Sequence, residues 1–250
     1  MNAHHRVGNG PHAVIAVHGW FGDRHAFRHM EDALAHTEFS YLFMDCRGYG
    51  DMQQSGGPYT MEQVAADVLE LADAAGVATF SLVGHSMGAK AIQRVLTQAP
   101  ARVRKLVALT PVPASGVPFD EAGWALFCGA VDSPANRQAI IDYTTGNRLT
   151  ATWVHAMAAY SLAHSAREAF AGYLDAWAKG DFSAEVHGRQ HPVHVIVGAH
   201  DPAVTAEVMG ATYLAWYPNA TLEVMPNAGH YPMDETPVAL ATSIEAFLRA

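Results

Sequence analysis

Short apolar runs alternate with longer amphipathic stretches along most of the chain. The runs predict β-strands buried on both faces of a sheet, because nearly every position in them is apolar. They are Ala13–Val17, Phe39–Met44, Phe80–Val83, Leu106–Leu109, Val193–Val197 and, with a weaker pattern, Thr221–Met225. We expect one more strand at His4–Val7, paired with the next strand through a turn at Asn9-Gly10.

The stretches between the runs carry apolar residues at helical spacing. They predict helices at Met61–Ala75, Met87–Gln98 and Thr236–Leu248. Thr60 is a suitable N-cap for the first helix, because its hydroxyl can accept from a free N–H group of the first turn. Strands that alternate with helices predict an α/β fold, with a mostly parallel sheet covered by helices on both faces.

The alternation is interrupted once, between residues 111 and 189, where the pattern predicts only helices. These are expected at Asp120–Val131, Pro134–Tyr143, Thr150–His164 and Arg167–Lys179. Long insertions between two strands of a compact domain are uncommon and often functional. We therefore expect residues 1–110 and 190–250 to form the core domain, and residues 111–189 a helical cap. The cap should cover the carboxyl edge of the sheet, where open α/β sheets bind ligands.

The pentapeptide Gly84-His85-Ser86-Met87-Gly88 joins a predicted strand to a predicted helix. A Gly-x-Ser-x-Gly sequence in this context is typical of a sharp turn that exposes a nucleophilic serine. Small residues are needed because the turn crowds the backbone, and the following helix N-terminus offers N–H groups to an anion. The alternative is a chance match with a structural serine. The flanking strand and helix favour Ser86 as a nucleophile.

Acyl transfer needs two hydrogen-bond donors for the oxyanion of the tetrahedral intermediate. His18-Gly19-Trp20 follows the strand Ala13–Val17, and the backbone N–H of Trp20 is the candidate for one donor. The N–H of Met87 is the candidate for the other. Alternatively, the loop is an ordinary glycine-containing strand exit.

Two further residues follow predicted strands at the same edge. Asp201 comes after Val193–Val197, and His230 comes after Thr221–Met225. Asp201 precedes a proline and could instead be a simple turn residue. The chain order Ser86, Asp201, His230 is, however, the order of nucleophile, acid and base in α/β-hydrolases. We expect His230 to act as general base and Asp201 to orient it.

With these motifs the chain resembles the α/β-hydrolase superfamily along nearly its whole length. The resemblance rests on the His18, Ser86, Asp201 and His230 motifs and on Asp45-Cys46-Arg47-Gly48-Tyr49-Gly50, all in the family order. It implies an α/β-hydrolase fold, a serine-esterase-like activity and a helical cap. Asp45 and Arg47 are expected to hold the turn structurally. The fold hosts many reactions, so the resemblance is less specific for chemistry.

The composition excludes several classes of protein. The chain has 250 residues, of which 50% are hydrophobic and 16% charged, which suits one packed domain. Its net charge is −9, and the densest basic stretch, Arg102–Lys105, holds three cations, so we expect no nucleic-acid partner. No run approaches the ~20 apolar residues of a membrane span, and the first apolar run is too short for a signal peptide. We expect a cytoplasmic protein without a membrane partner.

The cysteines and histidines do not indicate a metal site. Cys46 and Cys128 are too few for a disulfide framework and are expected to be reduced. Two histidine pairs have i,i+4 spacing, His25 with His29 and His187 with His191. Neither pair has an evident third ligand. We expect no metal and no cofactor.

The predicted cap is rich in aromatic residues, and most of them are expected to pack against one another. A few are expected to line an apolar substrate pocket beneath the cap. The candidates for substrate contact, from the cap and from the loops below it, are Trp20, His85, Trp124, Phe127, Trp153 and Met157.

The leading hypothesis is a carboxylic ester or lactone hydrolase that acts on a small, largely apolar molecule through an acyl-enzyme. Three alternatives stay open. They are a carbon–carbon bond hydrolase with the same triad, a cofactor-free dioxygenase of the same superfamily, and a receptor-like ligand-binding module. The sequence does not determine the substrate or the oligomeric state, and a homodimer is left open.

Overall fold

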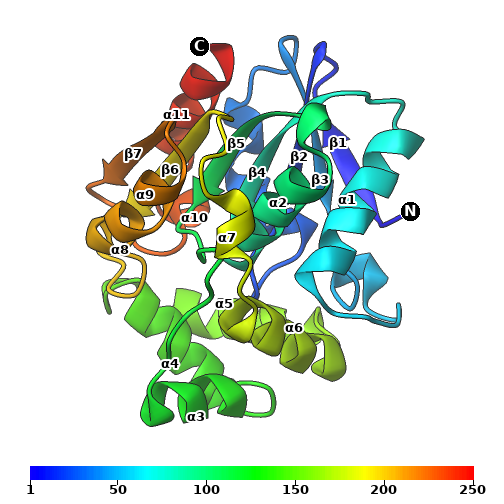
Figure 1. The fold of residues 1–250 in the computed structure, drawn as a ribbon. Helices are drawn as coiled ribbons and strands as arrows, with labels where there is room; N and C mark the ends of the chain where they lie inside the picture. Colours follow the sequence, from blue (N-terminus) through cyan, green and yellow to red (C-terminus); the bar gives the residue numbers. More distant parts are fainter.

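A seven-stranded sheet forms the centre of the molecule in the computed structural model, which describes residues 1–250 (Figure 1). The strands are β1 (His4–Val7), β2 (His12–Val17), β3 (Phe39–Met44), β4 (Phe80–His85), β5 (Val103–Leu109), β6 (Val193–Gly198) and β7 (Ala220–Met225). Their order in the sheet is β1-β3-β2-β4-β5-β6-β7, and every neighbouring pair is parallel except β1 with β3. This is the predicted α/β architecture.

The expected pairing of β1 is wrong. The strand forms, but it pairs with β3, where His4 lies opposite Met44, and not with β2 through the turn at Asn9-Gly10. The reason is that β2 is already paired on both sides, with β3 and β4. Instead of closing a hairpin, the turn packs against the start of β3, where the N–H of Gly10 donates to Phe39 O at 3.0 Å.

Helices cover both faces of the sheet. They are the 3-10 helices η1 (Arg24–Ala33), η2 (Gly50–Met52) and η3 (Pro100–Arg102), with α1 (Met61–Ala74), α2 (Met87–Gln98), α7 (Ser183–Val186), α8 (Ala206–Ala211), α9 (Tyr213–Trp216), α10 (Pro232–Glu235) and α11 (Pro237–Arg249). Helix α1 packs beside α2, and α11 packs beside η1. The Thr60 hydroxyl accepts from the N–H of Gln63, so the predicted N-cap of α1 is confirmed. None of the helices combines the length and apolar character that a membrane crossing requires.

Between β5 and β6 the chain forms α7 and, before it, the four predicted helices: α3 (Glu121–Gly129), α4 (Pro134–Thr144), α5 (Ala151–Ala163) and α6 (Arg167–Lys179). Their ends differ from the predicted ends by at most two residues. In Figure 1 they gather in a layer of their own below one end of the sheet. Contacts with the loop after β2 place this layer over the carboxyl ends of the strands, as shown below.

The turn between β4 and α2 leaves no room for side chains at its two glycines. A Cβ atom on Gly84 would lie 2.5 Å from Gly88 O, and one on Gly88 would lie 2.2 Å from Val17 O. The start of α2 therefore lies directly against the end of β2. This contact brings the loop after β2 next to residue 86.

We expect Gly88→Ala to destabilise the fold by at least about 2–3 kcal/mol, because the new methyl group would overlap backbone that cannot move freely. Gly210→Ala in α8 is the matched control, since a Cβ atom there meets no atom within 4 Å. That variant should be neutral or more stable by up to ~1 kcal/mol, because alanine favours the helix. Urea unfolding of both variants checks this, and similar midpoints for the two would contradict it.

Candidate active site

Ser86 lies at the apex of the turn between β4 and α2 in a strained conformation. Its φ is 53° and its ψ is −112°, a region that residues other than glycine rarely occupy. The turn is held by backbone hydrogen bonds on both sides, from Ser86 N to Leu109 O at 2.9 Å and from Val112 N to Ser86 O at 3.2 Å. The strain is therefore fixed by neighbouring strands, and the hydroxyl is held at the edge of the sheet.

The structure brings Ser86, His230 and Asp201 together from three separate parts of the chain. His230 Nε2 lies 3.0 Å from Ser86 Oγ, and His230 Nδ1 lies 2.5 Å from Asp201 Oδ2. An ionised carboxylate can only accept, so it receives the Nδ1 proton, and this leaves Nε2 free to accept from the Ser86 hydroxyl. The imidazole is thus held in the tautomer that can remove a proton from Ser86.

Asp201 is oriented by its own turn. Its Oδ1 accepts from the N–H groups of Ala203 at 2.9 Å and Val204 at 3.1 Å, while Oδ2 faces His230. The carboxylate is therefore both a turn residue and a partner of the imidazole, so the two interpretations of Asp201 from sequence are compatible.

The main chain of His230 is held just as firmly. Its carbonyl accepts from His85 Nε2 at 2.8 Å and from Thr110 Oγ1 at 2.9 Å, and its N–H donates to Thr144 O at the end of α4. Burial lowers the pKa of His85 well below its ordinary value, so this ring is a neutral donor. His85, a predicted substrate contact, is only 3% exposed, and its ring both lines a cavity described below and positions the backbone of His230.

The backbone N–H groups of Trp20, Phe21 and Met87 donate to no acceptor within the protein. Met87 begins α2, whose N-terminus carries partial positive charge. The close contact between α2 and the end of β2 places the Trp20 loop beside it. Both N–H groups expected from sequence to form the oxyanion hole are thus free, and the N–H of Phe21 is a further candidate.

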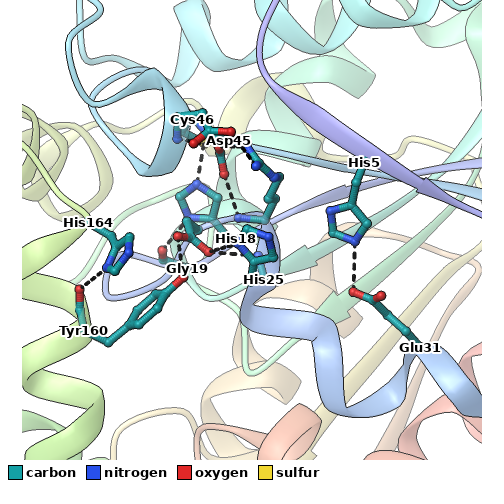
Figure 2. Close-up of polar contacts among 12 residues, drawn as sticks. His5, His18, Gly19, His25, Glu31, Asp45, Cys46, Tyr160 and His164 are labelled. Atoms are coloured by element: carbon teal, nitrogen blue, oxygen red, sulfur yellow. Dashed lines mark hydrogen bonds and ion pairs between the residues drawn. The ribbon is translucent and has the colours of Figure 1, made fainter.

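Buried polar groups fix the loop after β2 (Figure 2). His18 Nδ1 donates to Gly19 O at 2.8 Å, and His18 Nε2 accepts from the N–H of Cys46 at 3.0 Å. Burial lowers the pKa of His18, so it stays neutral in this role. Asp45 accepts from the N–H groups of Arg24 and Asp51. These residues are structural supports of the site.

The cap is joined to this loop by aromatic and polar contacts. The ring of Trp20 stacks on Phe170 of α6 with 3.9 Å between centroids, and its indole N–H donates to Phe170 O at 2.8 Å. The hydroxyl of Tyr160 on α5, shown in Figure 2, donates to Asp23 Oδ2 at 2.8 Å. The cap therefore covers the edge where Ser86 lies.

A small cavity beneath the cap contains Ser86 and His230. This Ser86 cavity has a volume of about 90 Å³, and 11 of its 14 lining residues are hydrophobic. Trp20 and Phe127 line it, as expected from sequence.

A second cavity of about 190 Å³ shares Phe21 and Tyr231 with the first. Because Arg28 is among its lining residues, we call it the Arg28 cavity. Trp153 and Met157, two predicted substrate contacts, line this cavity.

Trp124 lines neither cavity, against the expectation from sequence. Its ring instead packs beneath the ammonium of Lys179 at 4.1 Å and beside Phe119, with 6.2 Å between ring centroids. A cation from a neighbouring helix can cover an aromatic ring, and the periodicity of the sequence does not reveal such a contact.

Sequence reasoning missed two charged residues of the Arg28 cavity, Arg28 and Asp234. Arg28 lies on η1, which was not predicted because only Phe27 and Met30 of its residues are buried. Asp234 lies on the short helix α10, four residues after His230. Desolvation by burial raises the pKa of Asp234 from an ordinary 3.8 to about 6, although nearby Arg28 opposes the shift.

Comparison with known families agrees with the fold described above. Residues 12–237 match the family model described as the alpha/beta hydrolase fold. The chain belongs to this family. Membership places it in a superfamily of hydrolases and explains the sheet order, the turn at Ser86 and the cap inserted after β5.

A curated relative in this family is 3-oxoadipate enol-lactonase 2 from Acinetobacter baylyi. It is 26% identical over 226 residues, which cover 88% of this chain and 83% of that protein. The matches to several other curated relatives span between 28% and 65% of their length. Such partial matches support common ancestry but say little about a shared substrate.

Solved structures superpose closely on this chain. A bromoperoxidase from Bacillus anthracis matches with a TM-score of 0.89 at 19% identity, covering 99% of this chain and 95% of that one. The enol-lactonase from Burkholderia xenovorans LB400 matches with a TM-score of 0.83 at 23% identity, covering 99% and 96%. At these identities the likeness shows the fold alone.

The carboxyl group of Asp234 gives a pH-dependent prediction. Its pKa is raised in the folded state, so ionisation costs stability as the pH rises from about 4 through about 6. Asp234→Asn should therefore be more stable than the wild type by about 1–3 kcal/mol at pH 7.5, and the difference should vanish near pH 4. Urea unfolding at both values measures it. An equal difference at the two pH values would argue against a raised pKa.

Proposed function

We propose that this protein is a serine hydrolase that cleaves a carboxylic ester or lactone with a small, largely apolar acyl group. The observation that carries the proposal is the chain of contacts from Ser86 Oγ to His230 and from His230 to Asp201, at 3.0 Å and 2.5 Å. These contacts supply a nucleophile, its base and the acid that orients the base.

In the first half-reaction, His230 Nε2 takes the proton of Ser86 as the hydroxyl oxygen attacks the carbonyl carbon. Asp201 stabilises the imidazolium that forms. The N–H groups of Met87 and Trp20 are the donors proposed for the oxyanion, since both are free of other acceptors. His230 then returns the proton to the leaving alcohol, and the acyl group remains on Ser86.

In the second half-reaction, His230 activates a water molecule, which attacks the acyl carbon. The carbon–oxygen bond to Ser86 breaks, His230 gives its proton to the serine oxygen, and the acid leaves. No redox step is required, and every proton moves through His230.

Two features support an ester or lactone with a small acyl group. The Ser86 cavity has a volume of only about 90 Å³, and most of its lining is hydrophobic. The lactonase relative from Acinetobacter baylyi, at 26% identity, supports the choice of an ester or lactone carbonyl.

The first test is whether Ser86 reacts covalently. A fluorophosphonate should label Ser86 stoichiometrically, and a series of p-nitrophenyl esters with increasing acyl length should be hydrolysed best at short lengths. In Ser86→Ala, kcat should fall by roughly 10⁴-fold or more with the fold intact, because members of a triad act as a unit. Labelling is followed by mass spectrometry and hydrolysis by absorbance.

The same variant separates the alternatives. A cofactor-free dioxygenase would consume oxygen with a heteroaromatic substrate, and this activity would survive Ser86→Ala but not His230→Ala. A carbon–carbon bond hydrolase would prefer a diketone to the esters, and a binding module would react with neither. Esterase activity that persists at a tenth of the wild-type rate in Ser86→Ala would falsify the acyl-enzyme mechanism.

The oxyanion hole is tested at residue 20. Trp20→Ala and Trp20→Pro both lose the ring that stacks on Phe170, but only the proline variant also loses the backbone N–H. We expect kcat to be about 10²–10³-fold lower in the proline variant than in the alanine variant. Kinetics of both variants, each checked for folding by circular dichroism, measure this. Equal values would move the donor to Phe21.

A further inference from the structure

The Arg28 cavity adjoins the Ser86 cavity on the side of His230. Tyr231, the next residue in the chain, forms a wall of both cavities, and Phe21 forms a second shared wall. In the proposed reaction, His230 protonates the leaving alcohol. The group that leaves is therefore on the His230 side of the scissile bond, towards the Arg28 cavity.

This cavity contains a cation without a counter-ion. Arg28 Nε donates to His29 Nε2 at 3.2 Å, and no nitrogen of Arg28 lies within ion-pair distance of a carboxylate. The next arginine along the chain towards the N-terminus, Arg24, is paired with Asp45 and Asp51. In a protein with a net charge of −9, an exposed, unpaired guanidinium that lines a cavity adjoining the Ser86 cavity is available to a ligand.

The other charged groups of the cavity do not cancel this cation. Asp234 also lines it, and its Oδ1 lies 3.5 Å from His29 Nε2, the atom that accepts from Arg28. Burial raises the pKa of Asp234 to about 6, so this carboxyl is mostly ionised at neutral pH, but it forms no ion pair with Arg28. His25, an exposed residue that also lines the cavity, lies 3.3 Å from the buried Asp23, which also accepts from Tyr160.

Resting on the proposed function, we infer that the Arg28 cavity receives the leaving-group side of the ester and that this group carries a carboxylate bound by Arg28. The guanidinium presents paired N–H donors that match a carboxylate. Trp153 and Met157 line the same cavity and supply apolar contact for the atoms between the ester oxygen and the carboxylate. The substrate is then an anionic ester with a short acyl group.

The test uses three aryl acetates with the same acetyl group. They are 4-acetoxyphenylacetate, its neutral isostere 4-acetoxyphenylacetamide, and a trimethylammonium analogue. The wild type should have the lowest KM for the carboxylate. Arg28→Gln should raise that KM about tenfold, the scale of a charge-assisted hydrogen bond in a partly exposed site, and leave the amide unchanged. Asp234→Asn should lower the KM for the carboxylate about two- to fivefold by removing a like charge.

Arg104→Gln is the matched control, because Arg104 is an exposed arginine of β5 that lines neither cavity. It should leave all three esters unchanged. The inference is overturned if Arg28→Gln affects the carboxylate and the amide equally, if Arg28→Gln affects neither, or if the wild type prefers the trimethylammonium ester.

A binding measurement keeps the two proposals separate. Calorimetric titration with 4-hydroxyphenylacetate, which is not hydrolysed, should give about tenfold weaker binding in Arg28→Gln than in the wild type. If this difference appears but Ser86 is not labelled and no ester is cleaved, the subsite stands and the proposed hydrolysis fails. If esters are cleaved but 4-hydroxyphenylacetate binds both proteins equally, the hydrolysis stands and the subsite fails.

Discussion

The site depends on one close approach between two pieces of backbone. The first turn of α2 touches the end of β2 so closely that a Cβ atom on Gly88 would lie 2.2 Å from Val17 O. That contact places the N–H groups of Met87 and Trp20 on adjacent segments, and Ser86, in the turn just before Met87, has a strained conformation with a φ of 53°. Strain of this kind persists only when the surrounding structure determines it, and here buried parallel strands on both sides do so.

The cap is held over this edge by buried cations as well as by apolar packing. Lys90, in the first part of α2, donates to Trp177 O at 2.9 Å and to Gly180 O at the end of α6. Burial lowers the pKa of Lys90 to about 8. Arg137 of α4 stacks on Phe170 at 3.6 Å, and Phe170 in turn stacks on Trp20. The helix that follows the nucleophile and the loop that follows β2 are therefore each joined directly to the cap.

Much of the site could be predicted from local patterns. A strand before and a helix after Ser86 identify its turn, and the positions of Asp201 and His230 after strands place them at the same edge, because parallel strands end together. The supports of these residues could not be found in this way. His85 and Thr110 both donate to the carbonyl of His230, a contact between residues at least 120 positions apart in the chain. No local pattern encodes such a contact.

The sequence by itself determined the α/β class, the positions of the buried strands along the chain, the four cap helices and the residues that could act as nucleophile, acid and base. Each of these follows from short-range periodicity or from a motif within a few residues of a strand end. Only the tertiary structure decided that β1 pairs with β3, that Trp124 lies outside both cavities, and that Arg28 and Asp234 share one. Those outcomes depend on which surfaces meet across the cap and the sheet, and chains with similar local patterns can pack such surfaces in different ways.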